Sequence, residues 1–467
     1  MANESKKKPN SSAYDDYLSS ESFDELDNDI AYFEKKDKRP KEAPAREVKK
    51  PARRVVAPKK AKSKPEETRA PKRPLSPEAE ERQQKRRERT AALDKRNVLI
   101  ASILVCALLL LASILTLASG DLQYSENEKR YLAQRPAFSM SAVADGSYMK
   151  DMESYLSDQF VARGTMVRLR TMADIFVGKK EINDVYIGKK HFLFEKPAKV
   201  NEAALSKTID SVNSFSKKYP KINSYFVLAP SASEVLEELM PNNAPVENQT
   251  ARIKSVYTSL DKSIKTIDVC ATLQSSDDRQ SLYYRTDHHW TTPAAEIAFK
   301  QIAANMKLNT GKVDYESFAV TNRFQGTLAA SSGLFRAKDS IFITAPKTDI
   351  KYAVSYKEEN RKSASMFDSE KLKGNNQYEV FFGGNFAEVH IDTTLNSKQV
   401  LLVIKDSYAN CLVPMLMPYY KSIIMVDPRY YKDNLQALIK SEAVTDILWL
   451  YNVNTFVSDT SIQNVIK

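Results

Sequence analysis

The chain contains little of the cysteine and histidine on which disulfide frameworks and metal sites depend. Its 467 residues include three cysteines, Cys106, Cys270 and Cys411, and four histidines. Three cysteines build no disulfide framework, and the spacing matches no metal motif. We therefore expect no metal and no other cofactor. A large, nearly cysteine-free exported domain is more typical of a Gram-positive surface than of an animal secretory protein.

Glycine is absent from the first 96 residues, which also lack apolar clusters and contain nine of the 20 prolines. A segment with so little apolar surface cannot offset the entropy of ordering its backbone. The composition therefore predicts a disordered tail over residues 1–96.

The formal charge of +11 belongs mainly to this tail. Residues 1–37 hold 5 Lys/Arg against 10 Asp/Glu, residues 38–96 hold 22 against 9, and the rest of the chain is nearly balanced at 43 against 40. The basic part lacks the interleaved aromatic residues of a base-stacking surface, so we expect no nucleic-acid partner.

Residues 98–119 contain no charged side chain over 22 positions. A helix of this length rises about 33 Å, which is enough to cross a bilayer. The run is too long and too far from the N-terminus for a signal peptide, so it predicts one transmembrane helix over 97–119.

Basic residues precede this run and acidic ones follow it. Six Lys/Arg lie at positions 85–96, whereas Asp121 and Glu126 come after the span. Positive charge stays on the cytoplasmic side, so we expect a cytoplasmic N-terminus and an extracellular C-terminal part at the plasma membrane. The basic run should also contact anionic lipid.

The exported part reads as two segments. Residues 120–200 show a near-helical apolar spacing between Tyr148 and Val161 and then a hairpin pattern around residues 185–194. Residues 201–467 alternate apolar strands with helical patterns, with strands expected at 222–228, 266–269, 400–404, 423–426 and 447–450. Continuous apolar strands between helices predict an α/β domain with a doubly wound parallel sheet and a β-rich insertion between Gly311 and Phe382.

Two adjacent histidines occur in the segment Thr286-Asp287-His288-His289-Trp290. In an extended chain, Asp287 and His289 share one face and His288 points away. A carboxylate beside an imidazole fixes the tautomer and stabilises the imidazolium, as general-base catalysis requires. A metal site on the same residues is an alternative, but adjacent histidines on a strand diverge.

Ser407 lies where an apolar strand ends and a helix begins. This placement brings a hydroxyl to the carboxyl edge of the sheet, where the free N–H groups of the helix can receive an oxyanion. Ser407 can also be a simple helix cap. The pairing with Asp287 and His289 favours catalysis, and Ser231, which follows another strand, is expected to line the same cleft.

The Thr286–Trp290 segment, together with Lys405-Asp406-Ser407-Tyr408, resembles the DHHW protein family of Gram-positive bacteria. Further matching segments are Glu126–Arg130, Val185–Lys189, Phe382–Asn385 and Asp427–Tyr431. That family is similar to the alginate O-acetylation proteins, which carry an SGNH-hydrolase-like domain.

The resemblance implies that Ser407 is the nucleophile, His289 the general base and Asp287 the residue that orients the imidazole. It also suggests Trp290, Gly384 and Asn385 as residues that contact the substrate or the oxyanion. Lys405 departs from the pattern, since the hydrolase motif has glycine there.

Two functions follow as hypotheses. The first is a membrane-anchored O-acetyltransferase or acetylesterase that acts on a cell-wall polysaccharide or exopolysaccharide, with a membrane-bound O-acyltransferase as the partner that the resemblance suggests. The second is a catalytically inactive surface scaffold or glycan-binding protein.

Overall fold

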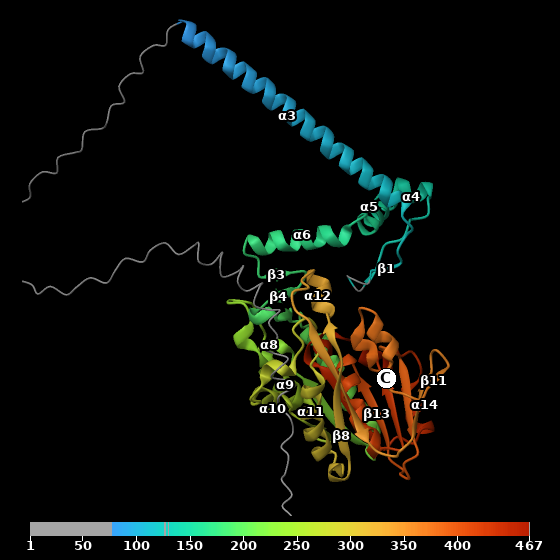
Figure 1. Ribbon diagram of the computed structural model, residues 1–467. Helices are drawn as coiled ribbons and strands as arrows, with labels where there is room; N and C mark the ends of the chain where they lie inside the picture. The colour runs from blue at the N-terminus through green and yellow to red at the C-terminus, as the bar shows by residue number, and fades with distance from the viewer. Residues whose placement is uncertain (1–76, 126–127, 129, 467) are drawn as a thin grey trace, which may run out of the picture. The chain divides into compact units, whose positions relative to one another are not determined.

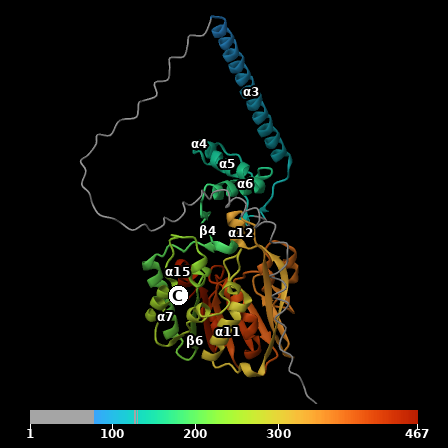
Figure 2. The same ribbon diagram turned by 60° about the vertical axis from the view of Figure 1, so that its left-hand side comes forward.

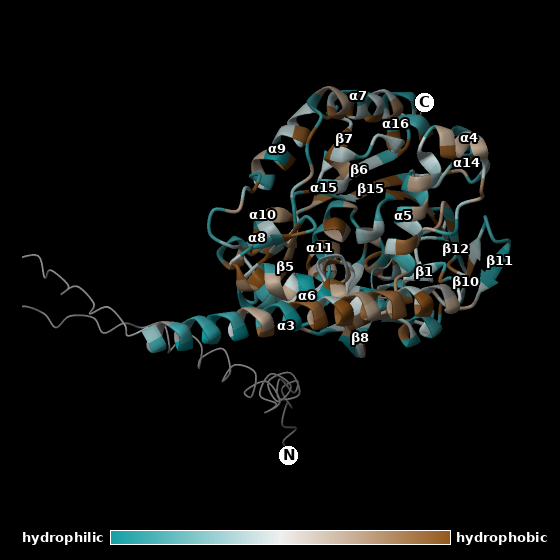
Figure 3. Ribbon diagram, turned by 90° about the horizontal axis from the view of Figure 1, so that it is seen from above, coloured by the Kyte–Doolittle hydropathy of each residue, from teal (hydrophilic) through white to brown (hydrophobic). Residues whose placement is uncertain are grey.

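The computed structural model describes residues 77–125, 128 and 130–466 (Figure 1). Helix α3 (Pro77–Ala118) contains the predicted span, and it is the one helix of the described chain long and apolar enough to cross a membrane. In Figure 3 its polar first part gives way to a continuous apolar part.

The predicted disordered tail lies outside the described residues as far as position 76. Residues 77–96 are helical instead, which differs from the expectation. Good helix formers such as Ala, Gln, Lys and Arg extend the helix from the apolar run, and a Glu81–Lys85 pair at 2.5 Å adds support one turn apart.

The segment after the span contains two short strands, three helices and a small sheet. These are β1 (Tyr124–Ser125), β2 (Arg130–Tyr131), α4 (Met140–Ala144), α5 (Ser147–Gln159), α6 (Arg163–Phe176), β3 (Glu181–Ile182), β4 (Val185–Ile187) and β5 (Leu193–Glu195). Strands β4 and β5 pair antiparallel, as the hairpin pattern predicts.

An eight-stranded sheet forms the centre of the C-terminal domain, in the order β11-β10-β12-β14-β13-β15-β6-β7. The strands are β6 (Asn223–Ala229), β7 (Ile264–Thr266), β10 (Tyr352–Tyr356), β11 (Arg361–Ser363), β12 (Glu388–Thr393), β13 (Val400–Lys405), β14 (Ser422–Val426) and β15 (Asp446–Asn452). Five of them, from β14 to β7, are parallel, whereas β12, β10 and β11 add antiparallel pairs. The sheet is therefore mixed: β12 runs antiparallel to β14, and the β-rich insertion supplies the next two strands, β10 and β11.

Alternating side chains of the central strands pack into two separate cores. Phe226 and Trp449 belong to one core, with helices α7 (Glu202–Lys218), α9 (Gln249–Ser259), α14 (Leu435–Ser441), α15 (Val453–Ser458) and α16 (Ser461–Val465). Val227 and Leu450 belong to the other, with α8 (Ala232–Val235), α10 (Cys270–Gln274), α11 (Thr292–Asn305), α13 (Val413–Leu416) and the hairpin β8 (Asp314–Phe324) and β9 (Asp339–Lys347). Figure 2 shows α7 and α11 on opposite sides of the sheet, which is the doubly wound arrangement expected from continuous apolar strands.

Strand β13 marks the point at which the chain reverses its direction across the sheet. The chain passes from β13 to β14 on one side and then returns to β15 on the other side of β13. In open α/β sheets the crevice at the carboxyl end of such a strand is where ligands bind. Ser407 lies two residues beyond this end.

Candidate active site

Asp287, His289 and Ser407 form a continuous hydrogen-bonded chain. His289 Nδ1 lies 2.5 Å from Asp287 Oδ1, and His289 Nε2 lies 2.7 Å from Ser407 Oγ. Residues 407 and 289 are 118 positions apart and come together because the segment before α11 lies over the end of β13. The exposed fractions are 2% for Asp287, 5% for His289 and 9% for Ser407, so the hydroxyl is the most accessible of the three groups.

The Asp287 carboxylate is held by four donors. Oδ1 accepts the backbone N–H of His289 at 3.0 Å as well as its imidazole, while Oδ2 accepts the Thr327 N–H at 2.7 Å and its hydroxyl at 3.0 Å. Thr327 begins the short helix α12 (Thr327–Ser332). The orientation of the Asp287 carboxylate is therefore fixed by two segments of the chain, its own segment with His289 and the start of α12, which lies 40 residues later.

A second buried carboxylate holds the backbone next to Asp287. Asp339 accepts the N–H groups of Arg285 and Thr286 and the Thr286 hydroxyl, and that hydroxyl accepts the Gly326 N–H at 3.0 Å. Burial raises the pKa of Asp339, and these donors oppose the shift. The network ties β9, the Asp287 loop and the start of α12 together.

Burial lowers the pKa of the His289 imidazole to about 4, and the neighbouring His288 adds to this shift. Asp287 opposes it by attraction and by its hydrogen bond. At neutral pH the imidazole is therefore uncharged. With Nδ1–H directed to Asp287, Nε2 is free to accept the proton of the Ser407 hydroxyl.

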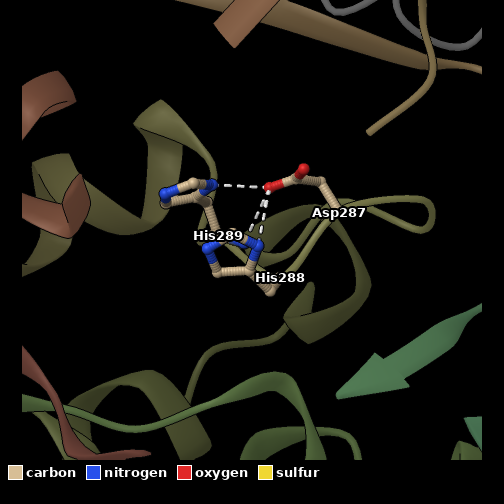
Figure 4. Close-up of side chains that lie close together, drawn as sticks. All are labelled: Asp287, His288 and His289. Carbon is tan, nitrogen blue, oxygen red and sulfur yellow. Dashed lines mark hydrogen bonds and ion pairs between the residues drawn. The ribbon is translucent and has the colours of Figure 1, made fainter. Parts of the chain in front are cut away.

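The expectation that His288 points away from Asp287 is wrong. His288 Nδ1 lies 3.7 Å from Asp287 Oδ1 and 2.8 Å from Thr327 Oγ1, and its ring centroid is 3.9 Å from that of His289. Figure 4 shows both imidazoles turned toward one carboxylate oxygen. The reason is that residues 284–289 form a loop closed by the Tyr283–Trp290 bridge, so the alternation of a strand does not apply.

This cluster brings three potential metal-ligand atoms within 4.8 Å of one another. The argument against a metal from diverging side chains therefore fails. However, both ring nitrogens of His289 are engaged. Nδ1 carries the hydrogen directed to Asp287, and the Nε2 lone pair accepts from Ser407, so neither nitrogen is left to bind a metal. The donor set thus fits proton transfer better than metal coordination.

Trp290 is completely buried, and its indole N–H donates to the Tyr408 carbonyl at 2.9 Å. The Tyr408 hydroxyl in turn donates to the carbonyl of His288. These two bonds join the Asp287–Trp290 segment to the Ser407 segment. The geometry of Trp290 is that of a residue that positions the site, which differs from the expected substrate contact.

A helix begins at Ser407, and it is a short 3₁₀ helix (Ser407–Cys411). Asp406 accepts the Tyr408 N–H at 2.9 Å with its side chain, and its carbonyl accepts the Ala409 N–H. These two N–H groups are therefore engaged and do not form the free helix terminus expected for an oxyanion. Burial raises the pKa of Asp406, and the Asn452 N–H, also donated to it, counteracts the rise.

Gly384 and Asn385 lie on a loop with left-handed backbone at Phe382, Gly383 and Gly384. The Asn385 side-chain oxygen accepts from Lys405 Nζ at 3.2 Å and from Asn410 Nδ2 at 3.1 Å. Asn385 therefore contacts the helix that carries Ser407 through Asn410. Among the described residues, no hydrogen bond joins Asn385 to Ser407 itself. Lys405, which stands in place of a glycine, is buried among Asn385, Asn410 and Asp427, and burial lowers its pKa.

Ser231 is buried and lies one step further from the site. Its N–H donates to Gln249, and its hydroxyl accepts from Asn452 Nδ2 at 3.1 Å. Asn452 also donates its backbone N–H to Asp406. Ser231 thus connects to the Ser407 segment through Asn452 and Asp406, and not directly.

The most prominent residue missed from the sequence is Tyr378. Its ring stacks on the His289 imidazole, with centroids 3.9 Å apart and planes 15° apart, and its hydroxyl lies 3.4 Å from the Ser407 carbonyl. Tyr378 follows no motif and lies 89 positions after His289. The sequence also carries no sign of three other contacts of the site, because no motif marks them: Gly326, Thr327 and Asp339.

Comparison with known proteins identifies the fold of the C-terminal domain. Residues 185–374 match the family model of the SGNH hydrolase-like domain of acetyltransferase AlgX; this range contains Asp287 and His289 and ends before Ser407. A DHHW family protein from Eubacterium siraeum superposes with a TM-score of 0.52 at 20% identity over 61% of this chain and 95% of that one. The domain has an SGNH-hydrolase-like fold. The resemblance to the DHHW family and to the alginate O-acetylation proteins is likewise confirmed.

Two further proteins show similarity to the SGNH-like domain. Bacillus cereus PatB1 with a sulfonyl adduct superposes with a TM-score of 0.51 at 17% identity over 59% of this chain and 98% of that one. The probable alginate O-acetylase AlgJ of Pseudomonas syringae pv. tomato is 26% identical over 180 residues, or 36% of this chain. That match spans 45% of the length of AlgJ.

Proposed function

We propose that the chain is a membrane-anchored, extracytoplasmic O-acetyltransferase or acetylesterase. The observation that carries this proposal is the hydrogen-bonded chain from Asp287 through His289 to Ser407, with contacts of 2.5 and 2.7 Å. Such a chain activates a hydroxyl for attack on an acyl carbon. The match of residues 185–374 to an acetyltransferase domain supports the same chemistry.

In the proposed reaction, the Ser407 oxygen attacks the carbonyl carbon of an acetyl ester while His289 Nε2 takes the hydroxyl proton. Collapse of the tetrahedral intermediate breaks the ester bond, and the imidazolium returns the proton to the departing alkoxide. The acetyl group is then bound to Ser407. In the second half, His289 removes a proton from a sugar hydroxyl or from water, which attacks the acetyl-serine and restores the Ser407 hydroxyl.

The substrate class proposed is a cell-wall polysaccharide or exopolysaccharide. AlgJ is a probable alginate O-acetylase, and the similarity of this chain to it supports a polysaccharide substrate here. A membrane-bound O-acyltransferase is the proposed source of acetyl groups. The single anchor helix would hold the domain near such a partner.

The test is labelling by a fluorophosphonate, which reacts with activated serine hydroxyls. Full-length protein in membranes should be labelled, and the Ser407→Ala protein should not, because the proposed activation acts on the Ser407 hydroxyl. The label should map to the peptide containing Ser407. An unlabelled wild-type protein that still binds polysaccharide would instead support the inactive glycan-binding alternative.

The labelling rate should respond to pH with an unusually low midpoint. Because the pKa of His289 is lowered to about 4, the neutral base predominates down to about one pH unit above that value. The rate should thus stay level from about pH 8 to 5 and fall through about pH 4. Intrinsic fluorescence of the two tryptophans checks that the fold persists, and a midpoint near the ordinary histidine value of about 6.5 would contradict a buried base.

Orientation in the membrane gives another prediction. Basic residues precede the span, which supports a cytoplasmic N-terminus. External protease on intact cells should therefore release peptides only from beyond Gly120. The segment from Lys38 to Arg96 should be cut only after the cells are permeabilised. Release of that segment from intact cells would reverse the proposed topology.

A further inference from the structure

Helix α6 presents a stripe of exposed apolar side chains. Met166, Leu169, Met172 and Phe176 recur at intervals of three or four residues, which places them on one face. Their exposed fractions are 53%, 54%, 59% and 91%. A contiguous apolar face of this kind, exposed on the surface of a protein, indicates an interaction site.

The opposite face of α6 is already occupied. Thr171 is 3% exposed and donates its hydroxyl to the Ser332 carbonyl at 2.9 Å, at the end of α12. Arg168 lies over the Phe335 ring at 5.2 Å. The apolar stripe therefore faces away from α12, and the SGNH-like domain leaves it uncovered.

The start of α6 is attached to the end of the membrane-spanning helix. The Val161 N–H donates to Thr116 Oγ1 at 3.0 Å, and the Tyr155 hydroxyl donates to Asp121 at 2.6 Å. Thr116 ends the apolar stretch of α3 that is long enough to cross a membrane. If that stretch spans the bilayer, residue 161 is held at the level where hydrocarbon meets headgroups, and α6 begins two residues later.

Cationic side chains accompany the stripe. Arg170 is exposed on α6, and Lys180 is exposed shortly after the helix ends. Basic residues beside an apolar face are the arrangement that places a helix in the plane of a membrane surface, where they meet anionic headgroups.

We propose that α6 lies in the outer lipid surface with Met166, Leu169, Met172 and Phe176 inserted among the acyl chains. Together with the span, it would hold the SGNH-like domain to the membrane at two points and limit its rotation about the anchor. The inference uses the membrane span and does not depend on the proposed acyl transfer.

The test uses full-length protein in vesicles of phosphatidylcholine and phosphatidylglycerol, with Cys106→Ala as the background. A polarity-sensitive fluorophore is attached at Leu169→Cys or, as a second site, at Met172→Cys. Interfacial helices bury their apolar face about 5–10 Å deep, so a lipid with a spin label near the headgroup should quench both sites strongly. The matched control is Ser255→Cys on the exposed face of α9, which should be quenched far less than either α6 site.

Aqueous iodide provides the complementary measurement. It should quench the control site and spare positions 169 and 172. If iodide reaches both α6 sites as readily as the control, lipid does not cover this face and the proposal is overturned.

Discussion

Ser407→Ala and His289→Ala should each reduce acetyl-ester turnover on the order of 10⁶-fold, and the double variant should be hardly worse than either single one. In the proposed mechanism, Ser407 attacks only when the imidazole of His289 takes its proton, across the 2.7 Å contact. Removal of either member leaves the other without function. The losses are therefore not additive, and the non-additivity is the measurement that separates a catalytic unit from two independent structural effects.

Matched controls lie elsewhere in the same chain. His191→Ala removes an exposed histidine and Ser255→Ala an exposed serine, so both proteins should retain wild-type turnover. Melting temperatures should stay close to wild type for Ser407→Ala, which deletes one hydroxyl. Wild-type turnover in both single variants would exclude the proposed chemistry, and additive losses would exclude the shared proton transfer.

Much of the fold was predictable because the central strands are apolar without interruption. The stretches around residues 224, 402, 424 and 448 are buried on both faces, and each is a strand of the central sheet. The antiparallel strands were less predictable, since β10 belongs to the insertion and pairs with β12, which follows the insertion. Sequence spacing does not encode which edge of the sheet such an insertion joins.

The helix at Ser407 was predicted, and its 3₁₀ type follows from its neighbours in the chain. Asp406, directly before it, caps the Tyr408 N–H, and Pro414 lies just beyond it at the start of α13. Proline lacks an N–H and fixes its own φ angle, so a regular α-helix does not run through this region. The result is a tight 3₁₀ turn that keeps Ser407 close to the strand end.

The candidate site divides in the same way between local and distant contacts. Asp287, His289 and Ser407 were predictable because each belongs to a short recognisable segment. The contacts that hold them were not, because Thr327, Asp339 and Tyr378 come from separate parts of the β-rich insertion. His288 was misplaced because a strand was assumed where the chain forms a loop.

Gly326 has an ordinary φ angle of −86°, so its backbone conformation does not require glycine. Its role is steric, because a methyl group built on it would overlap the Asp287 carboxylate. That carboxylate is held by Thr327 and by His289 and cannot move aside without breaking these bonds. Gly326→Ala should thus displace Asp287, the residue proposed to orient His289.

The expected effect of Gly326→Ala is a fall in turnover on the order of 10²-fold, the usual consequence of shifting a catalytic group by about 1 Å. Overpacking should also lower the free energy of unfolding by about 1–3 kcal/mol, which calorimetry would detect. Gly311→Ala is the matched control, because a methyl group there meets open space, and it should change neither quantity. If Gly326→Ala loses stability but keeps full turnover, then the position of Asp287 does not govern catalysis and its proposed role is wrong.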